Sequence, residues 1–247
     1  MTRPQVVAHR GSSAAHAENS WAAFEAAVAE GADVIECDVQ GTRDGVLVIR
    51  HDLALGDQRV AEGTFADIQA IQPGLVRLDE LLVWAAQKKI GLLVEVKDPD
   101  CAIPVGEMVA AHSWRERIVI GGFHWPALAT VKARFPALRT SLMMGSVIAA
   151  EDLARLATAY HADGVHPCWE ARSPHPHRLM DAAAIKLLRN AGLDVILWHE
   201  ERESELRALV ALRPDAICTN LPAMLRRIVD GTSIGTLTRE LAANDRI

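Results

Sequence analysis

The sequence predicts a (β/α)₈ barrel, the TIM-barrel architecture of the α/β class, folded as a single domain. Short apolar runs alternate with longer amphipathic stretches along the whole chain. This alternation indicates parallel strands joined by helices, and eight such units close a barrel. The length of 247 residues matches the roughly 250 residues typical of one such barrel. We expect the barrel to occupy residues 1–230 and residues 231–247 to form a short C-terminal extension.

Each predicted strand is a short apolar run that precedes a longer helical pattern. The strands are Gln5–His9, Asp33–Asp38, Leu92–Glu95, Ile118–Gly121, Leu138–Met143, Gly164–His166, Asp194–Trp198 and Ala216–Cys218. Amphipathic patterns predict helices at Trp21–Glu30, Leu78–Lys88, Pro126–Arg134, Glu151–Tyr160, His177–Asn190 and Glu203–Leu212. Glycines that end helices recur before strands, as in the GAD and AGLD segments at 31–33 and 191–194.

One unit departs from the alternation. Asp44-Gly45 lies between two β-prone runs, which is a hairpin turn signal. We therefore expect a small hairpin after the second strand, and we expect it to return His51 to the mouth of the barrel.

Composition excludes several classes of protein. Half of the residues are hydrophobic and 23% are charged, which excludes a disordered chain. The net charge of −6 argues against a nucleic-acid partner. There is no run of 18 apolar residues and no apolar leader, so we expect no integral membrane segment and a cytoplasmic protein. The four cysteines are far apart, which argues against a structural zinc site or a disulfide framework. A homo-oligomer is compatible with the sequence.

Polar residues gather where four strand-like runs end. The segments are AHRG (8–11), IECDV (35–39), IRHD (49–52) and VEVK (94–97). The carboxyl ends of barrel strands form the active-site face of such enzymes. We therefore expect these four segments to meet at one site.

Three carboxylates in these segments indicate a metal site. Glu36 and Asp38 alternate with Cys37 along a strand, so their side chains point to the same side. Glu95 ends a neighbouring strand and faces the same mouth. Three converging carboxylates must lose charge, find cations or bind a metal. Oxygen ligands favour Mg²⁺ or Ca²⁺, while the alternative is an ordinary ion-pair network with Arg10 and Lys97.

Two histidines flank the carboxylates. Histidine as a residue type titrates near neutrality, so one neutral and one protonated imidazole, from His9 and His51, can act as base and acid in one turnover. Arg10 offers a fork that matches phosphate oxygens, and Lys97 offers a point charge. The combination is suited to cleavage of a phosphodiester.

These segments resemble the glycerophosphodiester phosphodiesterase family. The family pattern is HRG, Pro-Glu-Asn-Thr, GAD, E-x-D, T-x-DG, HD and E-x-K. In this sequence it reads His9-Arg10-Gly11, Glu18-Asn19-Ser20, Gly31-Ala32-Asp33, Glu36-Cys37-Asp38, Thr42-Arg43-Asp44-Gly45, His51-Asp52 and Glu95-Val96-Lys97. Order and spacing match as far as Lys97, and a weaker match continues through Gly122-Phe123-His124, Leu197-Trp198-His199-Glu200 and Thr219-Asn220-Leu221-Pro222.

The resemblance implies a role for each matching residue. Glu36, Asp38 and Glu95 would hold one divalent cation, Mg²⁺ or Ca²⁺. His9 and His51 would be the general acid and base, and Arg10 and Lys97 would bind the phosphate. Trp198 matches the aromatic residue that lies against the glycerol part of the substrate, and Glu18 would orient Arg10 or a histidine, although Ala17 replaces the usual proline beside it.

The same resemblance implies the reaction. A glycerophosphodiester would be cleaved to an alcohol and glycerol 3-phosphate. The glycerol 2-hydroxyl would attack phosphorus, and water would then open the resulting cyclic phosphate. One alternative is a phospholipase D-like enzyme that acts on lysophospholipids or sphingolipids. Another is a non-catalytic barrel that binds glycerophosphodiesters.

The rear half of the sequence departs from the family pattern. Asn220 replaces an acid, and His199-Glu200 replaces Thr-Val; these changes could alter the alcohol that is accepted. The segment Leu53–Arg77 is short, which leaves little room for the lid subdomain that the family often inserts here. The segments at 166–169 and 173–177 could partly replace such a lid. They contain several histidines, and the sequence favours a proline-stiffened surface loop over a second metal site there.

Overall fold

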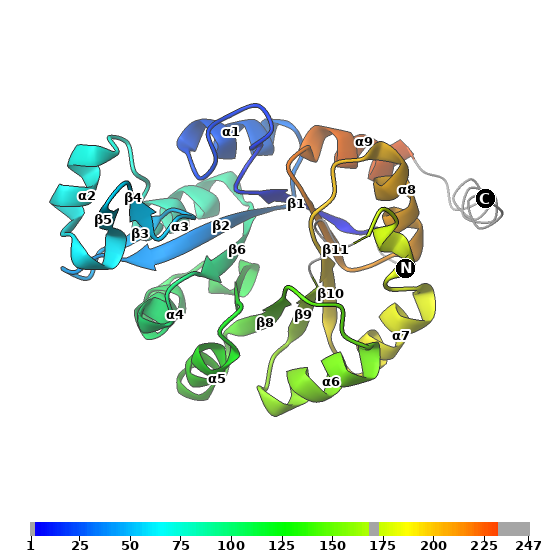
Figure 1. Ribbon diagram of the computed structural model, residues 1–247. Coiled ribbons are helices and arrows are strands. Elements are labelled where there is room, and N and C mark those ends of the chain that lie inside the picture. Colours follow the sequence, from blue (N-terminus) through cyan, green and yellow to red (C-terminus); the bar gives the residue numbers. More distant parts are fainter. Residues whose placement is uncertain (1–2, 168–172, 232–247) are drawn as a thin grey trace.

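Eight parallel strands close a barrel in the computed structural model, which describes residues 3–167 and 173–231 (Figure 1). Around the barrel they follow the order β1, β2, β6, β7, β8, β9, β10 and β11, and β11 pairs with β1 to close it. Their bounds are β1 Gln5–His9, β2 Val34–Gly41, β6 Gly91–Val96, β7 Ile118–Gly122, β8 Arg139–Met144, β9 Gly164–Pro167, β10 Asp194–Leu197 and β11 Ala216–Thr219. The predicted TIM barrel is therefore confirmed.

Helices surround the strands in the outer layer (Figure 1). Within the same residues they are α1 Trp21–Ala29, α3 Leu78–Lys88, α4 Ala102–Ala111, α5 Trp125–Arg134, α6 Ala150–Ala159, α7 Ala182–Asn190, α8 Glu203–Leu212 and α9 Pro222–Gly231. The predicted helix His177–Asn190 is divided: a 3₁₀ turn, η4 (Pro176–Arg178), precedes α7. The division arises because Asp181 caps α7 by accepting a hydrogen bond from the Ala184 N–H.

The core has two layers that follow from the alternation of strand side chains. One face of each strand packs against the helices, as Ile35, Leu92 and Ile120 do. The opposite faces fill the inside of the barrel with a smaller cluster that includes Val7, Leu93, Met143, Ile196, Trp198 and Cys218. The inside of the barrel is therefore packed with side chains.

The hairpin predicted after β2 is present. β3 (Leu47–Ile49) pairs antiparallel with the end of β2, and Gly45 adopts φ +82° in the turn. The Arg50 N–H then donates to the Asp38 carbonyl at 2.8 Å. This hydrogen bond keeps the chain beside β2, so the next residue, His51, lies at the carboxyl end of the barrel.

The short segment after the hairpin nevertheless folds into a compact unit. It contains the strands β4 (Ala54–Leu55) and β5 (Gln58–Arg59), a 3₁₀ turn at Val60–Glu62 and helix α2 (Phe65–Ile71). The unit has its own apolar cluster of Val48, Val60, Ile68 and Leu75. It lies outside the helical ring, at the left of Figure 1.

The expected C-terminal extension and part of the loop after β9 are not described by the structure. Residues 232–247 of the expected extension lie outside the described residues, as do residues 168–172 after β9. In the part that the structure covers, helices are too short or too polar to cross a membrane.

We predict that alanine at Gly11 is more destabilising than alanine at Gly45. Both glycines have positive φ, +86° and +82°, so either change costs about 1–2 kcal/mol of backbone strain. A Cβ at Gly11 would also lie 2.7 Å from backbone and side-chain atoms of Ala23, whereas nothing lies within 4 Å at Gly45. Overpacking adds about 1–3 kcal/mol. Urea unfolding measures the difference, and equal losses would contradict this explanation of the Gly11 turn.

Candidate active site

Three buried carboxylates meet at the carboxyl ends of β2 and β6. Strand register brings them together, because Asp38 pairs with Glu95 across these strands and Glu36 lies two residues earlier on β2. Glu36, Asp38 and Glu95 are 2%, 0% and 3% exposed. One oxygen of each lies within 4.8 Å of the others. Two carboxylates about 4 Å apart repel by about 4 kcal/mol at an effective dielectric of about 20, so the cluster requires compensation.

Two cations and an amide provide part of that compensation. The backbone N–H of Arg10 donates to Glu36 Oε2 at 2.9 Å, and Arg10 Nε lies 3.1 Å from Asp38 Oδ2. Lys97 Nζ lies 2.7 Å from Glu95 Oε1 and 3.5 Å from Asp38 Oδ1. Asn19 Nδ2 donates to Asp38 Oδ2 at 2.8 Å. The ion pairs that the sequence offered as an alternative are therefore present.

The compensation is incomplete, which is why the cluster is suited to a metal. Three carboxylates face two cations, and Glu36 Oε1 and Asp38 Oδ1 are buried without a hydrogen-bond partner. Burial, Asp38 and Glu95 raise the pKa of Glu36 well above its usual value. Burial and then Asp38 raise the pKa of Glu95, although Lys97 opposes the shift. A divalent cation would satisfy the free oxygens and the remaining negative charge together.

The loop after β1 positions Arg10 by an unusual backbone conformation. Arg10 and Asn19 have positive φ, +57° and +55°, and the Asn19 N–H donates to the Arg10 carbonyl at 3.0 Å. The loop therefore folds back on itself. Its Glu18 accepts a hydrogen bond from Arg10 Nη1 at 2.7 Å. Glu18 thus contacts Arg10 and holds its guanidinium group over the carboxylates.

His9 is buried in the wall of the site. It ends β1, in register with Glu36 on β2, and its Nδ1 lies 2.8 Å from Asn220 Oδ1. An amide oxygen can only accept, so Nδ1 carries the proton and Nε2 keeps its lone pair. Burial, Arg10 and His199 lower the pKa of His9 well below 6.5. His9 is therefore neutral at physiological pH, as a general base must be.

His51 has a different environment. It follows β3, its side chain is 33% exposed, and its Nδ1 lies 2.9 Å from Asp52 Oδ1. The hydrogen bond from His51 lowers the pKa of Asp52, and the charge of His51 opposes the rise in the pKa of Glu95. The two histidines therefore differ in burial and in polar partner, because His9 is buried beside an amide oxygen and His51 is partly exposed beside a carboxylate.

The remaining wall comes from β10, β11 and the residues that follow them. Trp198 contacts His9, His166 and Phe123, with ring centroids 5.6, 5.3 and 5.9 Å away. His199 stacks on His9 at 4.6 Å, and its Nδ1 lies 2.9 Å from Glu201 Oε1. A depression of about 380 Å³ opens here, lined by His9, Arg10, Ser13, Ala14, Glu18, His199, Glu201, Asn220 and Leu221.

The residues that depart from the family pattern have separate positions. His199 and Asn220 line the depression and contact His9 directly. The buried Glu200 pairs instead with Arg202, at 2.6 Å between Oε2 and Nη2. Sequence reasoning gave no role to Asn19, Glu201 or His166, although each contacts a site residue. For Asn19 the signal was its place in the Glu18-Asn19-Ser20 motif.

The model of the glycerophosphoryl diester phosphodiesterase family matches residues 9–224, a span that includes all nine residues singled out above as candidate site residues. The chain belongs to this family. The family and the enzyme class expected from the sequence are therefore confirmed.

Individual relatives agree along nearly their full lengths. A probable glycerophosphodiester phosphodiesterase 1 of Mycobacterium tuberculosis is 29% identical, with 94% of this chain and 95% of that one covered. A glycerophosphodiester phosphodiesterase of Caldanaerobacter subterraneus is 25% identical, with 91% and 97% covered. The barrel of a phosphodiesterase from Oleispira antarctica, solved in complex with the product sn-glycerol-3-phosphate, superposes with a TM-score of 0.79 at 22% identity, covering 92% and 97%.

His166, inside the barrel, predicts a pH dependence of stability. Both ring nitrogens are buried without partners, and burial lowers the pKa from 6.5 to about 3. Between these values the folded protein binds fewer protons than the unfolded chain. The contribution of His166 is therefore complete above pH 6.5 and decreases below it, by about 2 kcal/mol at pH 5.

We predict that His166→Phe, which keeps an aromatic ring against Trp198, reduces the stability lost between pH 7 and pH 5 by about 2 kcal/mol. Urea unfolding at both pH values measures this loss. A change at the exposed His16, His16→Ala, is the control and should leave it unchanged. If His166→Phe lost as much stability between pH 7 and pH 5 as the native protein does, the conclusion that His166 is buried without charge would be wrong.

Proposed function

We propose that the protein is a metal-dependent glycerophosphodiester phosphodiesterase that releases an alcohol and glycerol 3-phosphate. The observation that carries the proposal is the convergence of three buried carboxylates near two histidines in contrasting environments. Two of the carboxylate oxygens accept no hydrogen bond. Membership of the family supports the reaction class. The complex of the Oleispira antarctica neighbour with sn-glycerol-3-phosphate supports the product.

The carboxylate cluster would hold one divalent cation, Mg²⁺ or Ca²⁺. Glu36, Asp38 and Glu95 supply oxygen ligands, which these hard cations prefer. A cation bound there would lower the pKa of the attacking hydroxyl and neutralise charge on the phosphoryl oxygens. Glu36 Oε1 and Asp38 Oδ1, which accept no hydrogen bond, are the atoms best placed to bind it.

Arg10 and Lys97 would bind the phosphate. Both are fixed by carboxylates, Arg10 by Glu18 and Asp38 and Lys97 by Glu95 and Asp38. Burial disfavours the charge on each, but these neighbours raise the pKa of both groups, so they remain cationic. Fixed cations need little reorganisation as charge develops in the transition state.

The histidines divide the proton transfers. His9 Nε2 would take the proton of the glycerol 2-hydroxyl as its oxygen attacks phosphorus. Protonated His51 would give a proton to the leaving alcohol as the bond between phosphorus and its oxygen breaks. Water would then open the cyclic phosphate with the proton transfers reversed. Each transfer contributes about 10²–10⁴-fold, or roughly 3–5 kcal/mol of a total of about 8–23 kcal/mol.

The aromatic wall would receive the glycerol part of the substrate. Trp198 lies against His9, so a glycerol unit on its ring would bring a hydroxyl close to the base. His199 stacks on His9 and forms part of the same wall. We infer that His199 and Glu201 influence which diester is accepted, because both line the depression.

A panel of glycerophosphodiesters, assayed with chelator or with Mg²⁺, Mn²⁺ or Ca²⁺, tests the proposal. We expect metal-dependent release of glycerol 3-phosphate. Glu36→Gln should lose metal binding by calorimetry and at least about 10³-fold in turnover, since a metal contributes several kcal/mol. Glu62→Gln, at an exposed carboxylate, is the matched control and should behave as the native protein.

Two other outcomes would favour the alternatives. Cyclic lipid phosphate from a lysophospholipid, with no turnover of soluble diesters, would indicate a phospholipase D-like enzyme. Binding of glycerophosphodiesters without turnover in every metal would indicate a non-catalytic barrel.

We also predict different pH profiles for two histidine variants. His9→Asn and His51→Asn should each reduce kcat by about 10²–10⁴-fold. His9→Asn should remove the limb of the kcat/KM profile that rises with pH, because the base is lost, and His51→Asn should remove the falling limb. Stopped assays that extend from well below pH 6.5 up to pH 9 measure both profiles. Unchanged limbs in either variant would remove that histidine from proton transfer.

A further inference from the structure

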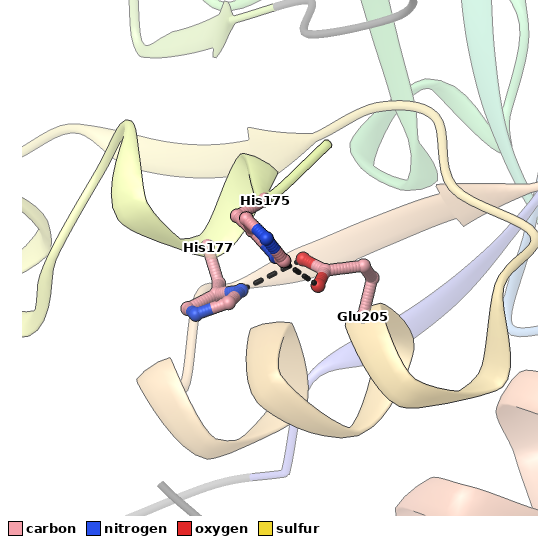
Figure 2. A group of neighbouring side chains, drawn as sticks. All are labelled: His175, His177 and Glu205. Atoms are coloured by element: carbon pink, nitrogen blue, oxygen red, sulfur yellow. Dashed lines mark hydrogen bonds and ion pairs between the residues drawn. The ribbon is translucent and has the colours of Figure 1, made fainter. Parts of the chain in front are cut away.

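A second group of potential metal ligands lies apart from the carboxylate cluster. His175 is the residue before η4, and His177 lies within η4. Glu205 belongs to the first turn of α8. Figure 2 shows both imidazoles turned toward the Glu205 carboxylate. His175 Nδ1 lies 3.3 Å from Oε1, and His177 Nδ1 lies 2.7 Å from Oε2. One ligand atom from each residue lies within 4.8 Å of the others.

Glu205 is a buried carboxylate in contact with two imidazoles. Glu205 and His177 are 6% and 7% exposed. Within residues 3–167 and 173–231, the ion-pair partners of Glu205 are these two imidazoles. A buried carboxylate is stabilised by a cation bound directly to it. Arg202, the residue before α8, is bound to Glu200, and its charge acts on Glu205 from a distance.

We propose that His175, His177 and Glu205 form a binding site for a divalent transition-metal ion, with Zn²⁺ as the expected occupant. Two imidazoles and one carboxylate are a common zinc ligand set, with zinc–ligand lengths of about 2.0–2.2 Å. A tetrahedral site of this size places ligands roughly 3.3 Å apart. The observed Nδ1–oxygen distances of 3.3 and 2.7 Å run to different Glu205 oxygens, and the three ligand atoms lie within 4.8 Å of one another, so the side chains would have to close around the ion.

Access and orientation are consistent with such an ion. The His175 side chain is half exposed, which leaves a route to solvent and room for a water ligand. His177 Nε2 is buried without a hydrogen-bond partner, so the contact at Nδ1 is the polar interaction that orients this ring. One ligand atom of each of the three residues thus borders the same small space. A surface loop, which the sequence favours here, does not require this convergence.

The ion would join two parts of the barrel rim. η4 belongs to the connection between β9 and α7, whereas Glu205 belongs to α8. Arg202 already links these parts, because its Nη1 donates to the Pro174 carbonyl at 2.7 Å while it binds Glu200. Glu201, the residue between Glu200 and Arg202, binds His199 in the wall of the active site. A metal here would therefore fix the support of that wall.

Zinc stoichiometry of the full chain tests the proposal. Chelator-treated protein is equilibrated with ZnCl₂, and bound zinc is measured by elemental analysis and by competition with a chromophoric chelator. We expect His175→Ala and Glu205→Gln each to lose one equivalent, or to bind it at least about 10-fold more weakly. His161→Asn, a change at an exposed histidine with positive φ, is the control and should bind as the native protein does.

Each comparison has an outcome that would overturn the proposal. Equal zinc content and affinity in the native protein, His175→Ala and Glu205→Gln would do so. Glu205→Gln keeps the size of the side chain, and a thermal unfolding curve shows whether it folds. Zinc binding that depends on Glu36 but not on Glu205 would also overturn the proposal. Zinc binding that depends on Glu205 but not on Glu36 would support this site and count against the catalytic metal site.

Discussion

Mutual repulsion among Glu36, Asp38 and Glu95 is the constraint around which the mouth of this barrel is arranged. At about 4 Å, each pair of carboxylates costs about 4 kcal/mol in a partly buried site. The parallel register of β2 and β6 makes the proximity unavoidable, because it aligns Asp38 with Glu95. The surrounding polar contacts can all be understood as responses to this one concentration of negative charge.

The loop after β1 and the hairpin after β2 provide those responses. Left-handed backbone at Arg10 directs both its N–H and its guanidinium group to the acids. The hairpin returns the chain to the same edge and brings His51 to Glu95. His9 receives the opposite environment, buried and hydrogen-bonded to an amide, and is therefore kept neutral. The chemistry that we propose depends on this difference between the two imidazoles.

Much of this organisation could be predicted from the sequence because it depends on local pattern. Each apolar run became a strand within three residues at either end, and Asp44-Gly45 became the hairpin turn. Other features were hidden by composition. Pro104 and Gly106 obscure the helical pattern of α4, and the cap formed by Asp181 separates η4 from α7.

Contacts between distant segments could not be predicted in the same way. The hydrogen bond from Asn19 to Asp38 depends on a loop that folds back through two left-handed residues. The burial of His166 depends on the packing of Trp198. The meeting of His175 and His177 with Glu205 depends on how a loop docks on a helix about thirty residues later in the chain. Periodicity carries no information about such docking.

Anomalous diffraction from crystals soaked with Mn²⁺ would test the central claim most directly. We expect one strong manganese peak within bonding distance of oxygen atoms from Glu36, Asp38 and Glu95, between the rings of His9 and His51. A catalytically active crystal with no peak at these three carboxylates would contradict the proposal that their repulsion is balanced by a metal ion.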